Sequence, residues 1–302
     1  MALTVSSCNL CPRACGADRQ NGITGFCGVG AEIIAARAAL HMWEEPCISG
    51  SRGSGAVFFA GCNLRCVYCQ NHEIAAARTG RQIKTARLAD IFLKLQEKGA
   101  ANINLVTPSH YVLAIREALL SAKKQGLQLP IVYNCGGYEK VEALRQLEDL
   151  VDIYLTDFKY GEEELAGAYS AAPDYPTVAA VALAEMVRQQ PKLLFGQEGY
   201  LQKGVIVRHL LLPGHVKNGK KVIKYVYENF GDQVLFSLMN QYTPLEAMTY
   251  DTGFPELHRK VTTREYDRFV DYAIELGIEN AFIQEGETAK ESFIPPFDCE
   301  GI

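Results

Sequence analysis

The chain has 302 residues, 48% of them hydrophobic and 22% charged, so it can bury the core of one large α/β domain or of a domain with an appendage. Its net charge of −5 offers no basic field for nucleic acid, and no apolar run approaches the ~18 residues that a membrane span needs. The N-terminus shows no signal-peptide pattern, so we expect a cytoplasmic protein. The ten cysteines are then better explained as metal ligands than as disulfides.

The first 50 residues are predicted to form a cysteine-rich, metal-binding extension, followed by a barrel domain over residues 51–302. The extension contains four closely spaced cysteines, Cys8, Cys11, Cys15 and Cys27. Glycines and a proline leave this segment little apolar surface, so we expect a metal to order it. Tetrahedral zinc, slightly preferred, and an auxiliary iron–sulfur cluster both suit four such thiols, and metal-free surface thiols are the alternative. Cys47 is either a further ligand or a buried structural residue.

A second group of cysteines follows an apolar run, residues 56–60, that is predicted to be a buried strand. This triad consists of Cys62, Cys66 and Cys69. Thiolates so close together suit a four-iron cluster, and three of them leave one iron open to a substrate or cofactor. The open iron indicates chemistry rather than electron storage. A zinc site or free buried thiols are the alternatives.

Beyond the triad, strand and helix patterns alternate along the chain. Strands are predicted over residues 102–106, 130–133, 151–155, 205–212 and 233–238, with a short closing strand over 281–284. With the first strand they form six strand–helix units, which predict a parallel sheet in an open, partial (β/α)6 TIM-like barrel. The carboxyl ends of barrel strands carry the active site. Here those ends hold the triad and polar residues at 107–110, 134–137, 157–159, 208–209 and 241–242.

Five motifs make the chain resemble the pyruvate formate-lyase activating enzyme-like branch of the radical S-adenosylmethionine (radical SAM) superfamily, in particular its PflX-type members. The motifs are Cys8-x2-Cys11-Pro12-Arg13, Glu44-Glu45-Pro46-Cys47, Cys62-x3-Cys66-x-Tyr68-Cys69-Gln70-Asn71, Tyr154-Leu155-x-Asp157-Phe158-Lys159-Tyr160 and Arg208-His209-x3-Pro213-Gly214. The resemblance implies that the triad binds a [4Fe-4S] cluster whose open iron is chelated by S-adenosylmethionine. It also implies that one electron, from a reduced flavodoxin or ferredoxin-type donor, cleaves S-adenosylmethionine to methionine and a 5′-deoxyadenosyl radical, which abstracts hydrogen from a substrate.

The resemblance and the strand ends together give a predicted set of cofactor-binding residues. This set is Tyr68, Thr107, Ser109, His110, Asn134, Asp157, Lys159, Arg208 and Gln241. Asp157 and Lys159 match a D-x-K motif of glycyl-radical activases, whose lysine is associated with the S-adenosylmethionine carboxylate and whose aspartate lies near a monovalent cation. A plain salt bridge at a strand end is the alternative for this pair.

The chain departs from the family pattern at two strand ends. Residues 107–110 stand where many relatives carry a Gly-Gly-Glu segment that receives the amino group of S-adenosylmethionine, so their hydroxyls and imidazole would have to substitute. Residues 134–136 stand where the family has a different loop, which argues against a cation there. Because side chains alternate along a strand, only one of Arg208 and His209 can face the barrel interior, and we expect Arg208.

The resemblance implies activation of a glycyl-radical enzyme by hydrogen abstraction from a backbone glycine. One alternative is a radical SAM enzyme that acts on a small molecule or on another protein side chain. A remote alternative is an iron–sulfur electron carrier, which would not need a barrel with polar residues at each strand end. No cysteine-rich insert follows Cys69 and no cysteine cluster lies near the C-terminus, which argues against two-cluster activases and against the common peptide-maturing type.

Overall fold

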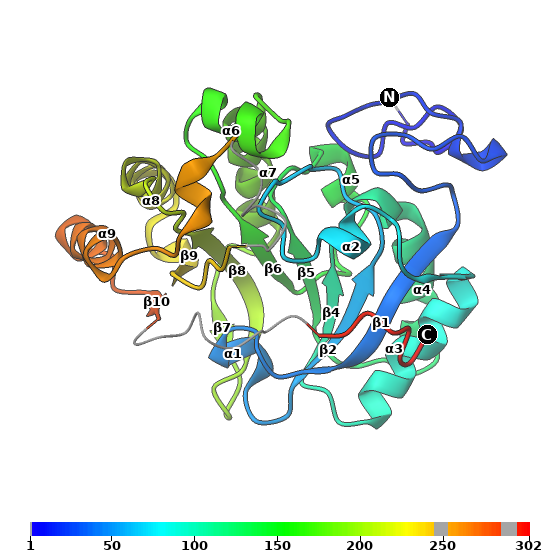
Figure 1. The fold of residues 1–302 in the computed structure, drawn as a ribbon. Helices are drawn as coiled ribbons and strands as arrows, with labels where there is room; N and C mark the ends of the chain where they lie inside the picture. Colours follow the sequence, from blue (N-terminus) through cyan, green and yellow to red (C-terminus); the bar gives the residue numbers. More distant parts are fainter. Residues whose placement is uncertain (1, 245–252, 285–294) are drawn as a thin grey trace.

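The computed structural model describes residues 2–244, 253–284 and 295–302, and parallel strands form the centre of the fold (Figure 1). Six of these strands are β2 (Ser54–Phe59), β4 (Ile103–Val106), β5 (Ile131–Cys135), β6 (Ile153–Asp157), β8 (Leu201–Leu210) and β9 (Val234–Met239). Each pairs in parallel with the next in that order. The predicted strands are therefore confirmed, with ends that differ by a few residues, and the architecture is the expected partial TIM-like barrel.

Further strands lie at the two edges of this sheet. At one edge β10 (Ala281–Ile283) pairs in parallel with β9, which confirms the predicted closing strand, whereas β7 (Leu194–Phe195) pairs antiparallel with β8 outside this strand order. At the other edge β1 (Ile33–His41) runs antiparallel to β2 and also pairs with β3 (Arg81–Ile83). The strand β1 was not predicted, because its segment is rich in alanine, which is depleted in strands. Since β1 lies within residues 1–50, part of the predicted extension belongs to the main sheet, and the boundary at residue 50 stays a prediction.

The longer helices cover the outside of the sheet (Figure 1). They are α3 (Thr85–Glu97), α4 (Val112–Lys124), α5 (Val141–Arg145), α6 (Glu163–Ser170), α7 (Tyr175–Gln189), α8 (Val216–Phe230) and α9 (Thr263–Leu276). Each buries an apolar face, as α3 does with Leu88, Ile91 and Phe92. None of the helices in the described residues is long and apolar enough to cross a lipid bilayer.

The short helix α1 (Pro46–Ser49) closes the amino-terminal end of the barrel. Its Cys47 and Ile48 pack in one apolar cluster with residues at the beginnings of the strands, among them Val132, Ile153 and Leu235. Burial raises the pKa of Cys47 to about 12. This packing supports the structural interpretation of Cys47 over a ligand role. It also directs the connection just before α1 into the barrel interior.

Two arginines attach the N-terminal segment to the barrel. Arg19 is 1% exposed, and its guanidinium donates to the carbonyl oxygens of Gly30 at 2.7 and 3.0 Å and of His110 at 2.8 Å. The Arg13 Nε donates to the Asn63 carbonyl in the triad loop at 2.9 Å. Because this segment has little regular structure, these side-chain bonds take the place of a strand or helix interface.

Candidate active site

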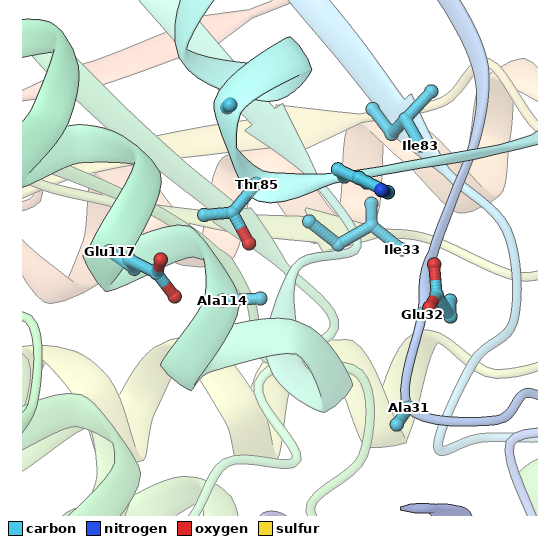
Figure 2. Close-up of a pocket in the computed structure, with 9 residues that line it drawn as sticks. Ala31, Glu32, Ile33, Ile83, Thr85, Ala114 and Glu117 are labelled. Carbon is cyan, nitrogen blue, oxygen red and sulfur yellow. The ribbon is translucent and has the colours of Figure 1, made fainter.

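Two cavities are candidates for the site. The larger, about 410 Å³, lies outside the barrel between residues 31–33, the beginning of α3 and α4 (Figure 2). Its lining includes Glu32, Thr85 and Glu117 and none of the predicted site residues. The smaller, about 260 Å³, opens at the carboxyl ends of the strands, and we call it the barrel pocket.

The barrel pocket brings together residues that are far apart in the sequence. It is lined by the three triad cysteines and by eight of the nine predicted cofactor-binding residues: Tyr68, Thr107, Ser109, Asn134, Asp157, Lys159, Arg208 and Gln241. The remaining residue, His110, does not line it. The chemistry expected at the strand ends is thus concentrated in the smaller of the two cavities.

The triad loop leaves β2 through Gly61, whose φ is +88°. Glycine adopts such a positive φ without steric cost. A Cβ there would lie 2.8 Å from the Cys27 carbonyl oxygen, so the position also requires a residue without a side chain. The loop continues to α2 (His72–Ala75), and the triad thiols between these points are free and partly exposed. Glycine at this position therefore lets the loop turn sharply against the N-terminal segment.

The donor set of the triad fits an iron–sulfur cluster. Burial raises the pKa of Cys62 and of Cys69 to about 12, so these thiols bind protons that a metal would displace. The Ser170 hydroxyl donates to Cys66 Sγ at 2.9 Å, and a hydroxyl chain continues from Ser170 through Tyr160 to Tyr68. Cys62 Sγ accepts from the Leu64 amide at 3.4 Å, so the loop offers three free sulfurs to one pocket and two of them already accept a hydrogen bond.

No group of three or more His, Cys, Asp or Glu side chains within the described ranges is spaced to hold a single metal ion. This finding does not weigh against a cluster at the triad, because each cysteine there would bind a different iron. It gives no support to tetrahedral zinc at Cys8, Cys11, Cys15 and Cys27, where four ligands must surround one ion. The N-terminal metal therefore stays a prediction.

Charged side chains from β6 and β8 form the floor of the barrel pocket. Lys159 Nζ lies 2.5 Å from Asp157 Oδ2, and Arg208 Nε lies 3.0 Å from Asp157 Oδ1. Burial by itself would lower the pKa of Lys159, but the neighbouring carboxylate raises it well above its usual value. Burial likewise opposes ionisation of Asp157, yet the two cations hold its pKa below its usual value. Both groups are therefore charged at neutral pH.

Strand alternation on β8 places Arg208 and His209 on opposite sides, as expected. Arg208 lines the barrel pocket, and its Nη2 donates to Asn134 Oδ1 at 2.6 Å. His209 points the other way, where its Nδ1 donates to the Phe158 carbonyl at 2.7 Å and its ring packs against Phe269. Burial lowers the pKa of His209 to about 4, so it is neutral and structural.

The end of β4 differs from the expectation in one respect. Thr107 and Ser109 line the pocket, but the His110 ring lies behind it, where Nε2 donates to the Ala60 carbonyl at 2.8 Å. Burial lowers the pKa of His110 to about 3. Ser109 donates to Glu139 at 2.5 Å, so its hydroxyl is already engaged. Of the three, Thr107 is the least committed to other contacts.

Glu44 is a pocket residue that sequence analysis did not include in the site. It comes from the connection between β1 and α1, and its Oε2 lies 3.1 Å from Arg208 Nη1. Its Oε1 accepts from the side-chain amides of Asn104 at 2.9 Å and of Asn134 at 3.2 Å. The available signal was the Glu44-Glu45-Pro46-Cys47 motif of the resemblance, from which no site residue was taken.

One family model, one curated protein and one solved structure are similar to this chain. Residues 56–188 match the model of the radical SAM superfamily. The chain is 28% identical over 278 residues to the uncharacterized protein MJ0674 of Methanocaldococcus jannaschii. The aligned region covers 88% of this chain and 74% of that protein. A solved structure, SuiB of Streptococcus suis, aligns with a TM-score of 0.48 and 13% identity over 77% of this chain. The alignment spans about half of SuiB, 48% of its length. Over residues 56–188, which include the cysteine triad, the chain therefore matches the radical SAM superfamily.

Proposed function

We propose that this enzyme activates a glycyl-radical protein by abstracting hydrogen from a backbone glycine. The observation that carries the proposal is the joining, in one pocket, of three free thiols with the Asp157–Lys159 pair of the activase-like motif. When bound, a [4Fe-4S] cluster and S-adenosylmethionine supply the radical chemistry for hydrogen abstraction. The protein supplies the binding groups, their orientation and the exclusion of water.

Each part of the pocket has a role in this proposal. Cys62, Cys66 and Cys69 hold the cluster. Lys159 binds the S-adenosylmethionine carboxylate, a charge-assisted contact between a buried ammonium and an anion. Thr107 offers a hydroxyl to the amino group at the end of β4. Tyr68 belongs to the triad loop, is 6% exposed, and anchors the loop through the hydrogen bond between its hydroxyl and that of Tyr160.

The barrel pocket opens at the carboxyl ends of the strands, so a loop of another protein that bears the target glycine could approach the triad from outside. A reduced flavodoxin or ferredoxin-type protein would supply the electron.

The test is 5′-deoxyadenosine formation by anaerobically reconstituted, chemically reduced protein that is given S-adenosylmethionine. We expect product from the wild type and none from Cys66→Ala, together with loss of the cluster's iron from the variant. Equal product from both would refute the assignment of the triad. Addition of candidate glycyl-radical proteins, with detection of the glycyl radical by electron paramagnetic resonance, then separates the activase from an enzyme acting on a metabolite.

A further inference from the structure

A chain of hydrogen bonds leads from inside the barrel to the pocket lysine. It begins at Glu44, whose side chain is 8% exposed and accepts from Asn104, Asn134 and Arg208. Glu44 enters through the connection that α1 fixes at the closed end of the barrel, so it approaches the pocket from below. Both of its carboxylate oxygens are engaged by the protein itself, which indicates a structural contact rather than ligand binding.

Arg208 is the second member of this chain, and all three of its guanidinium nitrogens donate to protein acceptors. Nε donates to Asp157 at 3.0 Å, Nη1 to Glu44 at 3.1 Å and Nη2 to Asn134 at 2.6 Å. The acceptors come from three different elements. Arg208 is therefore held in one orientation, and its fork is not free to grip a ligand carboxylate in bidentate fashion.

Asp157 divides its carboxylate between two cations. Oδ1 accepts from Arg208, whereas Oδ2 accepts from Lys159 at 2.5 Å. The two contacts compete, because a stronger bond to one cation weakens the hold of Asp157 on the other. Glu44 is the second carboxylate on Arg208, so it reduces the attraction between Arg208 and Asp157.

We propose that Glu44 is a positioning residue that acts through Arg208 and Asp157 on Lys159. By neutralising Arg208 it lets Asp157 engage Lys159, and it thereby limits how strongly the pocket binds the carboxylate of its ligand. This inference rests on the proposed function in one respect, namely that Lys159 meets the carboxylate of S-adenosylmethionine.

The sign of the effect follows from the charges. Glu44 and Asp157 carry two negative charges and Lys159 and Arg208 two positive ones, so these four side chains are neutral together. Burial raises the pKa of the neighbouring Glu45 carboxyl, which favours its uncharged form. Glu44→Gln leaves one net positive charge, and it also draws Asp157 toward Arg208 and frees Lys159. Both changes favour a bound carboxylate. For partly buried charges the expected gain in affinity is on the order of three- to tenfold.

The experiment measures binding of two ligands to the full-length, anaerobically reconstituted protein by isothermal titration calorimetry. S-adenosylhomocysteine carries the amino-acid carboxylate, and 5′-methylthioadenosine lacks it. In Glu44→Gln we expect the dissociation constant of the first to fall three- to tenfold and that of the second to stay the same. Glu185→Gln is the matched control, because Glu185 is a 4% exposed glutamate paired with Arg145 and Arg188 and does not line the pocket.

A second variant keeps the test decisive if Glu44→Gln does not fold. The double variant Glu44→Gln/Arg208→Gln removes both members of the ion pair, so neither charge is left buried without its partner. Lys159 is then the one cation that still pairs with Asp157. We expect it to bind S-adenosylhomocysteine several-fold more weakly than the wild type. Unchanged affinity in both variants, or equal shifts for the two ligands, would overturn the inference alone. A wild type that binds neither ligand would overturn the proposed function as well.

Discussion

The hydrogen bond from Ser170 to Cys66 is expected to tune the reduction potential of the cluster. Ser170 is 0% exposed, and its hydroxyl donates a hydrogen bond to Cys66 Sγ at 2.9 Å. The same hydroxyl accepts a hydrogen bond from the Tyr160 hydroxyl at 2.6 Å. A donor to a ligating sulfur stabilises the reduced cluster more than the oxidised one, because the reduced state carries more negative charge. Ser170→Ala removes this donor and leaves a space no larger than one hydroxyl group. The potential should therefore become more negative.

The size of the shift follows from the strength of one hydrogen bond. If the bond differs between the two states by about 0.5–1.5 kcal/mol, the one-electron potential falls by roughly 20–65 mV. The assay is a redox titration of the reconstituted protein followed by electron paramagnetic resonance. Thr156→Val is the control, because Thr156 accepts from the buried Cys135 thiol at 3.4 Å, outside the triad. A potential that is unchanged or more positive in Ser170→Ala would contradict the reasoning.

Three further predictions concern ligand binding, anchoring and pH. Lys159→Gln should raise the dissociation constant for S-adenosylmethionine by roughly tenfold to a hundredfold, whereas Lys203→Gln, at an exposed ion pair, should leave it unchanged in the same calorimetric titration. Arg19→Met should lower the free energy of unfolding of the metal-free protein by about 3 kcal/mol in urea titrations, more than Arg13→Met, because Arg19 is fully buried. Burial depresses the folded-state pKa of His209 to about 4, so between about pH 6.5 and 4 the unfolded chain binds a proton that the folded chain does not. The free energy of unfolding should therefore fall as the pH is lowered from about 6.5 to 4. In urea titrations at several pH values, His209→Gln should reduce the slope of this free energy against pH by up to about 1.4 kcal/mol per pH unit. An identical slope in the variant would rule out the role of His209.

The sequence predicted site residues correctly where they follow the carboxyl end of a strand that an apolar run marks. The apolar runs predicted β2, β4, β5, β6, β8 and β9, and parallel pairing brings the carboxyl ends of such strands to one rim. Asp157 and Lys159 could be placed in the site for this reason alone. Arg208 followed from the alternation of side chains on β8, since a two-residue period leaves only one of two neighbours facing inward.

Residues that reach the site by tertiary packing could not be found in this way. Glu44 belongs to a connection with no periodicity, and it enters the barrel only because α1 packs Cys47 and Ile48 against the beginnings of the strands. Ser170 is the last residue of α6, and its contact with Cys66 joins positions 104 residues apart. The motif that contains Glu44 does not show where its side chain lies, and Ser170 belongs to no motif, because both contacts depend on how distant elements are packed.

His110 shows a different limit of sequence analysis. It follows directly on β4, where position alone suggests a site residue, yet residues 109–111 form a turn of 3-10 helix that carries the ring behind the strand end. There it packs at 4.2 Å from the ring of Tyr111 and bonds the Ala60 carbonyl. The direction in which a side chain leaves a strand end is set by the turn that follows, and a sequence alone does not fix it.

The backbone conformation of Thr107 bears on the difference between residues 107–110 and the Gly-Gly-Glu segment of the family pattern. Its φ of +60° lies in the left-handed region, which is strained for a β-branched residue by about 1–2 kcal/mol. Glycine would adopt this conformation without strain, and a Gly-Gly-Glu segment stands here in many relatives that the chain resembles. The strained threonine is held in place by the bond from its own amide to the Asn134 carbonyl at 2.9 Å, and its side chain lines the barrel pocket. Because strain of this kind persists mainly where a side chain is used, it supports the proposed contact between the Thr107 hydroxyl and the amino group of the cofactor.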